Sequence, residues 1–436
     1  MSSRPQENPR ASRRAFLKAS AGAGAALAGA LAVGRGAHAA GSDVLKVGLI
    51  GCGGRGNGAA VNALNADPNA RLTAVADLFA ENIRSGLRYL KAEKGDQVAV
   101  ADDHRFTGFD GYQKVLASGV DVVILALPTF FHPAYLKACV DAGKHVFCEK
   151  IHAVDAPGVR TVLAASEEAK RKGLSIVSGL AWRYDLGVRE TMKRVHDGAI
   201  GEIVAIEETC NTGFLRSRPR QPQWTEMQYQ IQDWYNFFWL SCDLPGLNLV
   251  HNLDKAAWAM RDEPPVKCWG MGGQQTRVGP RFGDAWDHHA TVYEYANGVR
   301  MYAYCRQQDG CVTSIADRFW GTKGRCDLLA NRIEGETNWR YAGPPCNRFD
   351  LEHVALFSAI RSGKPINNGL YMARSSLLAI MATWASYTGQ EITWERAWNS
   401  NHVVAPEVLA FDAEPPTKPD AQGRYPMPVP GVTKFV

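Results

Sequence analysis

Two separate positions in the chain carry side chains suited to moving protons. Lys150 stands in the stretch Glu149-Lys150-Ile151-His152, directly after the apolar run His145 to Cys148. A lysine in a partly dry cleft has a lowered pKa and can take a proton from a substrate hydroxyl. His251 and Asp254 are three residues apart and share one face if that stretch is helical, where the carboxylate would orient the imidazole. A surface lysine and a hydrogen-bonded core histidine are the alternatives.

A glycine-rich stretch predicts which cofactor takes part in this chemistry. The apolar run Val44 to Ile50 passes into Gly51-Cys52-Gly53-Gly54-Arg55-Gly56, a G-x-G-x-x-G pattern typical of a strand, a tight turn and a helix start that faces the phosphates of a dinucleotide. A second apolar run ends in Asp77, 21 residues after Gly56. An acid there would accept hydrogen bonds from the adenosine ribose and repel a 2′-phosphate, so we predict NAD, with NADP less favoured.

The elements that must position these residues alternate between strand-like and helix-like patterns. Strands are predicted near residues 104–107, 120–126, 145–148 and 174–178, with helices at 133–142 and 156–172 between them. This alternation indicates a doubly wound parallel sheet, and we assign residues 44–180 to a Rossmann domain. Because such sheets bind ligands beyond the carboxyl ends of their strands, Lys150 should lie on the same edge as the glycine turn.

Beyond Gly187 the pattern becomes mainly antiparallel. One helix at 188–197 precedes strand-like runs at 202–209, 266–271, 289–295 and 299–306, and Asn297-Gly298 between the last two is a strong hairpin signal. Helices are expected at 351–362 and 371–387. We therefore predict an α+β domain on an open, mainly antiparallel sheet over residues 181–404, followed by a proline-rich C-terminal arm at 405–436.

The first segment has the features of an export signal. Paired arginines in Ser12-Arg13-Arg14-Ala15-Phe16-Leu17-Lys18 precede an uncharged Ala/Gly-rich stretch and a small-x-small cleavage site ending at Ala39. We predict a twin-arginine signal peptide over residues 1–39, use of the twin-arginine export machinery, and a periplasmic or extracytoplasmic location. The stretch is too short and too weakly apolar for a stable membrane anchor.

Removing residues 1–39 removes their net charge of +5, so the formal +5 of the chain falls to 5 − 5 = 0. Nothing in this charge balance indicates a nucleic-acid partner. The ten cysteines include no C-x-x-C pair, and the histidines and cysteines show no metal-ligand spacing, so no metal is predicted. A disulfide among the cysteines between residues 305 and 346 stays open.

Several motifs together resemble the glucose-fructose oxidoreductase, inositol dehydrogenase and rhizopine catabolism (Gfo/Idh/MocA) family, in its exported branch. They are the glycine turn with Asp77, Pro128-Thr129-x-x-His132, Gly143-Lys144-His145-Val146-x-x-Glu149-Lys150, and His251-Asn252-x-Asp254. The resemblance implies hydride transfer between nicotinamide and a sugar or cyclitol, catalysed by Lys150 and His251. The expected substrate-binding residues are Arg183, Asp254, Asn248 and His132, and the expected cofactor-binding residues include Pro128, Thr129, Glu149 and Lys150. It also implies a homodimer or homotetramer.

Two positions depart from the family pattern. Ile151 replaces the proline that usually follows Glu-Lys, and Leu247 replaces the acid that usually stands four residues before the histidine. Asp254 or Asp243 is the expected substitute for that acid, or catalysis depends mainly on Lys150.

The predicted export leads to an expectation about the cofactor, because no replenished NAD pool exists outside the cytoplasm. We therefore expect tightly bound NAD that is restored within each turnover. One route oxidises one sugar and reduces another, and the alternative oxidises a glycoside, cleaves it by elimination or hydrolysis, and returns the hydride. A non-catalytic nucleotide-binding protein is the remaining alternative.

Overall fold

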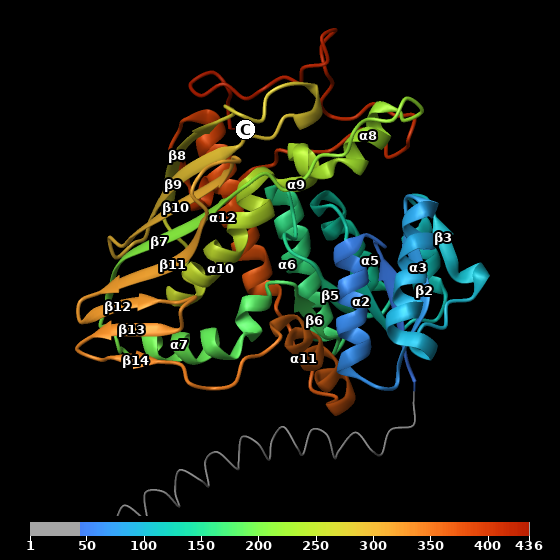
Figure 1. Cartoon of the computed structure of the whole chain (residues 1–436), viewed down its shortest axis with the longest axis horizontal. Helices are drawn as coiled ribbons and strands as arrows, with labels where there is room; N and C mark the ends of the chain where they lie inside the picture. The colour runs from blue at the N-terminus through green and yellow to red at the C-terminus, as the bar shows by residue number, and fades with distance from the viewer. Residues whose placement is uncertain (1–43, 436) are drawn as a thin grey trace, which may run out of the picture. The chain divides into compact units, whose positions relative to one another are not determined.

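The computed structural model describes residues 44–435. The predicted signal peptide lies outside the described residues. From Leu45 onward the described chain is one compact unit, built on two sheets that cover different parts of the sequence. Figure 1 shows the first sheet with its helices in blue to green and the second sheet in green to orange.

The first sheet has six parallel strands in the order β3-β2-β1-β4-β5-β6. The strands are β1 (Leu45–Ile50), β2 (Ala70–Asp77), β3 (Arg105–Thr107), β4 (Val122–Leu125), β5 (His145–Cys148) and β6 (Ile176–Ser178). The helices between and after them are α2 (Gly54–Ala66), α3 (Ala80–Lys94), α4 (Gly111–Ala117), α5 (His132–Asp141), α6 (Ala156–Arg171) and α7 (Leu186–His196). The order reverses between β1 and β4, which confirms the predicted doubly wound sheet.

Apolar side chains explain why this sheet is buried. All four residues of β4 are buried, as expected for a strand covered on both faces by helices. α6 begins at Asp155, whose carboxylate accepts a hydrogen bond from the Gly158 N–H, and Pro157 stands in its first turn. The described cysteines, which are all ten of the chain, are free, and eight of them are buried.

The second sheet has nine strands in the order β14-β13-β12-β11-β7-β10-β9-β8-β15. The strands are β7 (Ile203–Thr212), β8 (Lys267–Gly273), β9 (His288–Glu294), β10 (Arg300–Gln307), β11 (Ser314–Gly321), β12 (Gly324–Asp327), β13 (Arg332–Gly335), β14 (Trp339–Arg340) and β15 (Ile392–Thr393). Only β7 and β10 pair in parallel, so the mainly antiparallel prediction is confirmed. The predicted hairpin joins β9 to β10, with Gly298 at a φ of 83°.

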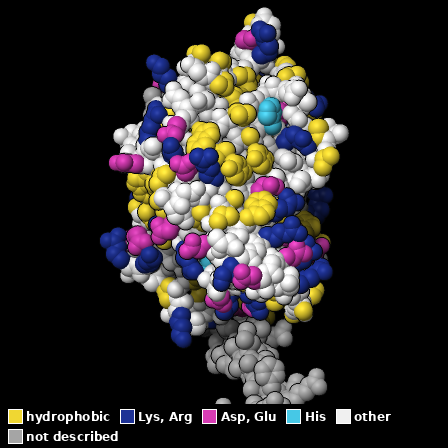
Figure 2. Space-filling view, turned by 90° about the vertical axis from the view of Figure 1, so that its left-hand side faces the viewer, with side chains coloured by type: hydrophobic (Ala, Val, Ile, Leu, Met, Phe, Trp, Pro, Cys, Tyr) yellow, Lys and Arg dark blue, Asp and Glu magenta, His cyan; other side chains and the backbone are white. Residues whose placement is uncertain are grey.

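One face of the second sheet is covered and the other faces outward. On β10, Met301, Ala303 and Cys305 are buried while Tyr304 is exposed, as the two-residue period of a strand requires. Figure 2 shows this outward face, where apolar side chains lie among charged ones. Its exposed apolar residues include Met271 and Tyr304.

Several helices connect the two sheets. These are α8 (Glu226–Gln232), α9 (Phe238–Ser241), α10 (Val250–Ala259), α11 (Arg348–Ser362), α12 (Gly369–Thr388) and α13 (Trp394–Asn399), with a π-helical turn at Pro245–Leu249 before α10. We expected α11 in the second domain. Instead it packs on α2, and Leu356 and Phe357 share a core with Val47 and Phe147 of the first sheet.

The final stretch, the predicted C-terminal arm, contains no regular element among its described residues, 405–435. In Figure 1 it runs in red along α8. Tyr425 donates a hydrogen bond to Glu226 at 2.6 Å, and the Gln230 amide donates to the Thr417 carbonyl at 2.8 Å. No described helix is long and apolar enough to cross a membrane.

Candidate active site

The glycine turn has the geometry that a dinucleotide requires. Gly51 has a φ of 98°, and a Cβ there would lie 2.2 Å from the Ala126 carbonyl oxygen. A Cβ on Gly56 would lie 1.8 Å from the Gly51 oxygen, so this glycine lets α2 pack close to β1. At Gly53 and Gly54 a Cβ would meet nothing within 4 Å. These two positions therefore leave open space in front of the α2 N-terminus, where phosphates bind favourably.

Asp77 ends β2 beside this turn. Its Oδ1 accepts hydrogen bonds from the Phe79 N–H and the Asn82 amide, and its Oδ2 accepts one from the Cys52 N–H at 2.8 Å. Burial raises the pKa of Asp77, and these donors lower it. Oδ2 keeps a lone pair for a ribose hydroxyl, which fits the predicted NAD site.

A cleft opens in front of the turn and holds about 870 Å³, including its open mouth. One wall comes from the first sheet and carries Gly51, Gly53, Gly54, Arg55, Gly56, Asp77 and Pro128. The opposite wall comes from the segment between β7 and α9 and carries Arg216, Arg218, Ile231, Gln232, Trp234 and Tyr235. Thr129 is buried beside Pro128, behind the lining.

Arg55 lines the cleft, but its charge is already matched. Its Nε donates to the Glu149 carboxylate, and its Nη2 lies 3.4 Å from Glu352. Glu149 also accepts a hydrogen bond from the Lys150 N–H at 3.2 Å. Glu149 therefore acts through Arg55 and the backbone and is absent from the cleft lining.

Lys150 follows β5 and points toward the second domain. Its Nζ donates a hydrogen bond to the carbonyl of Leu247, in the π-helical turn before α10. Burial lowers the pKa of Lys150, and the Glu149 carboxylate opposes that shift. The side chain can thus hold or take a proton closer to neutral pH than a surface lysine can. Ile151, the residue in place of the family proline, is buried.

His251 lies on the first turn of α10, one helical turn after Leu247. Its side chain is half-buried, and its Nδ1 has no hydrogen-bond partner among the described residues. Burial lowers the pKa of His251 well below its usual value, and the charges of Lys150 and Lys255 add to the shift. The imidazole is therefore neutral and able to accept a proton. Asn248 is half-buried in the preceding turn.

A buried ion pair lies beneath α10. Lys255, one turn after His251, places its Nζ 2.8 Å from the Asp317 carboxylate, and Asn252 donates to the same carboxylate at 2.9 Å. The neighbouring Glu208 is fully buried, and burial together with the charge of Asp317 raises its pKa. This cluster has no local signal in the sequence, because its members come from three distant elements.

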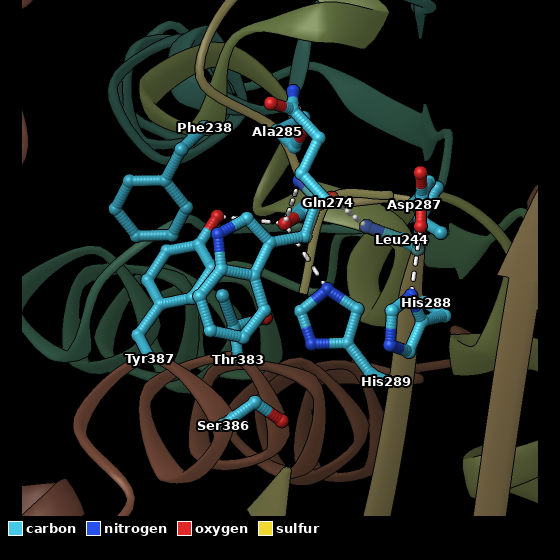
Figure 3. A network of polar contacts seen from close by, with 12 residues as sticks. Phe238, Leu244, Gln274, Ala285, Asp287, His288, His289, Thr383, Ser386 and Tyr387 are labelled. Carbon is cyan, nitrogen blue, oxygen red and sulfur yellow. Dashed lines mark hydrogen bonds and ion pairs between the residues drawn. The ribbon is translucent and has the colours of Figure 1, made fainter. Parts of the chain in front are cut away.

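Neither expected carboxylate orients His251. Asp254 accepts hydrogen bonds from Arg183 at 2.9 Å and from Ser375 at 2.8 Å. Asp243 accepts from Tyr387, from His289 and from the Trp286 N–H at 2.6, 3.1 and 2.9 Å. Figure 3 shows His289 and Tyr387 turned toward this shared acceptor. Both substitutes are wrong, because each carboxylate is fully buried and already committed to other donors.

Three predicted substrate residues also have other roles. Arg183 pairs with Asp254 and, at 2.6 Å, with Asp262, and its guanidinium lies 4.1 Å from the Tyr371 ring. His132 is fully buried, and its Nδ1 lies 2.6 Å from the Ile151 carbonyl oxygen. Arg183, Asp254 and His132 therefore make contacts that stabilise the fold around the cleft, and their substrate-binding role stays a prediction.

No group of three or more His, Cys, Asp or Glu residues able to hold a metal ion occurs within residues 44–435. The site thus consists of a dinucleotide cleft between a Rossmann sheet and an open sheet, with Lys150 and His251 outside the lining of that cleft. This combination defines a class of two-domain dinucleotide-binding proteins.

Comparison with known proteins identifies the class more closely. Residues 45–176 match the Gfo/Idh/MocA model, described as an oxidoreductase family with an NAD-binding Rossmann fold. Residues 45–176 are therefore similar to the Gfo/Idh/MocA oxidoreductase family.

The relatives and structural neighbours agree with this similarity to an oxidoreductase family. Inositol 2-dehydrogenase of Klebsiella pneumoniae strain 342 is 32% identical over 220 residues, which cover 50% of this chain and 55% of the relative. The 2,7-anhydro-N-acetylneuraminate hydratase of Escherichia coli K12 is 25% identical over 54% of this chain and 55% of its own. The chain thus spans about half the length of the curated relatives it matches. The aldose-aldose oxidoreductase structure from Caulobacter crescentus has a TM-score of 0.62 at 19% identity, over 80% of this chain and 100% of that one, and shares the fold.

Proposed function

We propose that the protein is an NAD-dependent oxidoreductase that transfers hydride between nicotinamide and a carbon of a sugar, cyclitol or glycoside. The observation that carries this proposal is Lys150, which leaves the carboxyl end of β5 beside the glycine turn and donates to the carbonyl one turn before His251. Bound NAD supplies the hydride acceptor. The chain supplies the groups that hold the substrate hydroxyl and take its proton.

The two proton-transfer residues have different tasks in this proposal. As the substrate C–H bond breaks and hydride leaves, the hydroxyl O–H bond breaks and a carbonyl forms. Lys150 donates a hydrogen bond to the substrate oxygen, and the neutral His251 imidazole accepts the hydroxyl proton. The nearby charges of Lys150 and Lys255 favour the return of that proton, which suits a reaction that must also run backwards.

We further propose that the NAD is tightly bound and restored within each turnover. The twin-arginine leader motivates this, because an exported enzyme has no external NAD supply. Oxidation of one sugar coupled to reduction of another is one route. Transient oxidation followed by elimination or hydrolysis is the other, and it is supported by the similarity to a hydratase that acts on an anhydro sugar.

The experiment follows bound nicotinamide and products together. Purified protein is mixed with a panel of sugars, cyclitols and glycosides, while the near-ultraviolet absorbance of reduced nicotinamide and the product masses are recorded. We expect at least one compound to be converted, and Lys150→Ala to abolish conversion while nucleotide stays bound. If neither absorbance nor mass changes with any compound, the protein binds nucleotide without catalysis and the proposal fails.

The outward face of the second sheet supports a homodimer or homotetramer. Met271 and Tyr304 are both exposed on this one open face, where each lies opposite Ala290, an arrangement that favours burial against another copy of the chain. Light scattering of the purified protein should give at least twice the chain mass, and Tyr304→Arg should lower it. A monomer at all concentrations would contradict this part.

A further inference from the structure

The wall of the cleft that faces the glycine turn comes from the second half of the chain. We name residues 213–236 the cap segment, which runs from the end of β7 through α8 to α9. It contributes Arg216, Arg218, Trp234 and Tyr235 to the cleft lining. A dinucleotide in front of the glycine turn would thus lie between two walls, and the cap segment carries the positive charge of the second.

Arg216 has an unmatched positive charge. Its side chain is exposed, and its guanidinium lies 5.5 Å from the Tyr235 ring centre. Within residues 44–435 that guanidinium makes no hydrogen bond and no ion pair. Because Arg55 on the opposite wall is paired with Glu149 and Glu352, Arg216 is a cation of this cleft that an anion can recruit without breaking an existing ion pair.

Arg218 is held in place by the cap segment itself. Its backbone N–H donates to the Asp233 carboxylate at 2.5 Å, and its Nη1 donates to the Gln232 side chain. The other Asp233 oxygen accepts from the Asn236 amide at 2.8 Å and from the Ser217 hydroxyl at 3.3 Å. Asp233 thus fixes the loop around Arg218. The guanidinium N–H groups of Arg218 that do not bind Gln232 stay available at the cleft.

Arg218 and Asp77 line the same cleft, and the charge of Arg218 lowers the pKa of Asp77. Asp77 keeps a free lone pair for the ribose diol and would repel a 2′-phosphate. Both arginines line the same cleft as the α2 N-terminus, and the phosphates in front of that N-terminus are those of the pyrophosphate, between the two ends of the dinucleotide.

We propose that Arg216 and Arg218 bind the pyrophosphate of the dinucleotide from the cap side, opposite the Gly51 to Gly56 turn. This rests on the proposed function in assuming that the cleft holds NAD. Backbone N–H groups of the turn hold one face of the pyrophosphate, and the two guanidinium groups hold the other. The pyrophosphate is thereby enclosed by two opposite walls, which slows its release.

The test measures binding with ligands that contain or lack the pyrophosphate. Protein stripped of nucleotide is titrated calorimetrically with ADP-ribose, which keeps the pyrophosphate, and with adenosine, which lacks it. The variants are Arg216→Gln, Arg218→Gln and the double variant. Arg220→Gln is the matched control, because Arg220 stands on the same loop but pairs with Glu226 and is absent from the cleft lining.

We expect each single variant to weaken ADP-ribose binding about tenfold or more and to leave adenosine binding unchanged, as expected for loss of a charge-assisted hydrogen bond. The Arg220→Gln protein should bind both ligands as the unaltered protein does. Equal ADP-ribose affinity in the double variant and the unaltered protein would overturn the inference. An equal loss for adenosine would also overturn it, because the arginines would then act on the shape of the cleft.

Two further outcomes separate this inference from the function it rests on. If the unaltered protein binds neither NAD nor ADP-ribose, the proposed function fails as well. If it binds NADP more tightly than NAD and Arg218→Gln reverses that order, the arginine binds the 2′-phosphate and the pyrophosphate assignment is wrong.

Discussion

The two glycines Gly53 and Gly56 provide a test that separates folding from nucleotide binding. Both belong to the same turn, yet their surroundings differ. A methyl group on Gly56 would meet the Gly51 carbonyl oxygen at 1.8 Å, whereas one on Gly53 would meet nothing within 4 Å. We therefore expect Gly56→Ala to destabilise the nucleotide-free protein, and Gly53→Ala to leave it stable while blocking the approach of the phosphates.

The expected size follows from these contacts. A buried overpacked methyl costs roughly 1–3 kcal/mol, and a clash with rigid backbone falls at the upper end of that range. The better helix propensity of alanine returns up to about 1 kcal/mol at Gly56, so the net loss is about 2 kcal/mol. Gly53 is the N-cap of α2 with no side-chain cap, so its replacement should change the free energy of unfolding by less than about 1 kcal/mol.

The assay is thermal and urea unfolding of both variants without nucleotide, followed by titration with NAD. Gly56→Ala should melt several degrees lower, since about 1 kcal/mol shifts Tm by roughly 2–4 °C for a domain of this size. Gly53→Ala should melt as the unaltered protein does and bind NAD at least about tenfold more weakly. A lower melting temperature for Gly53→Ala than for Gly56→Ala would refute the contacts described for the turn.

Three further predictions concern groups around the cleft. Asp254→Asn should lower the free energy of unfolding by about 2–3 kcal/mol in urea, because Arg183 then keeps only Asp262; an unchanged midpoint would contradict the pairing. Burial lowers the pKa of His132 to about 4 and that of His152 to about 3, so the unfolded chain binds more protons below pH 6.5. Urea midpoints should therefore fall as the pH drops from about 6.5 toward 4, and His152→Gln should weaken that dependence. The Phe411 ring of the C-terminal arm stacks on Phe79 in the cleft lining. Phe411→Ala should therefore speed NAD release in a competition assay without changing the melting temperature by more than a few degrees. An unchanged rate would show that the arm does not hold the cap segment.

The first sheet could be predicted almost strand by strand, because its signals are local. The His145 to Cys148 run gave β5 with its observed bounds, and the Asn297-Gly298 pair gave the β9–β10 hairpin. Short strands of the second sheet, such as β13 and β14, escaped prediction because runs of two to four residues carry no clear period.

The candidate site was predictable only where its residues follow strands of the first sheet. Lys150 and the glycine turn share an edge because parallel strands end together. Sequence spacing alone predicted the wrong partner for Asp254. A helical residue three positions after His251 can also face side chains of other elements, and Asp254 pairs with one of these, Arg183. The roles of Arg216 and Arg218 depend on where the cap segment packs, and no local pattern encodes that position.

The C-terminal arm makes the cleft depend on residues that follow both sheets in the sequence. The Phe411 ring stacks on Phe79, which lines the cleft beside Asp77, with ring centres 5.5 Å apart, and the Phe411 carbonyl accepts a hydrogen bond from Thr225 of the cap segment. The first contact joins residues more than three hundred positions apart along the sequence and the second joins residues 186 positions apart, the kind of closure that forms late in folding. On a ribosome, the strands of the first sheet can therefore form early, but the arm can hold the cap segment over them only after residue 411 has been made.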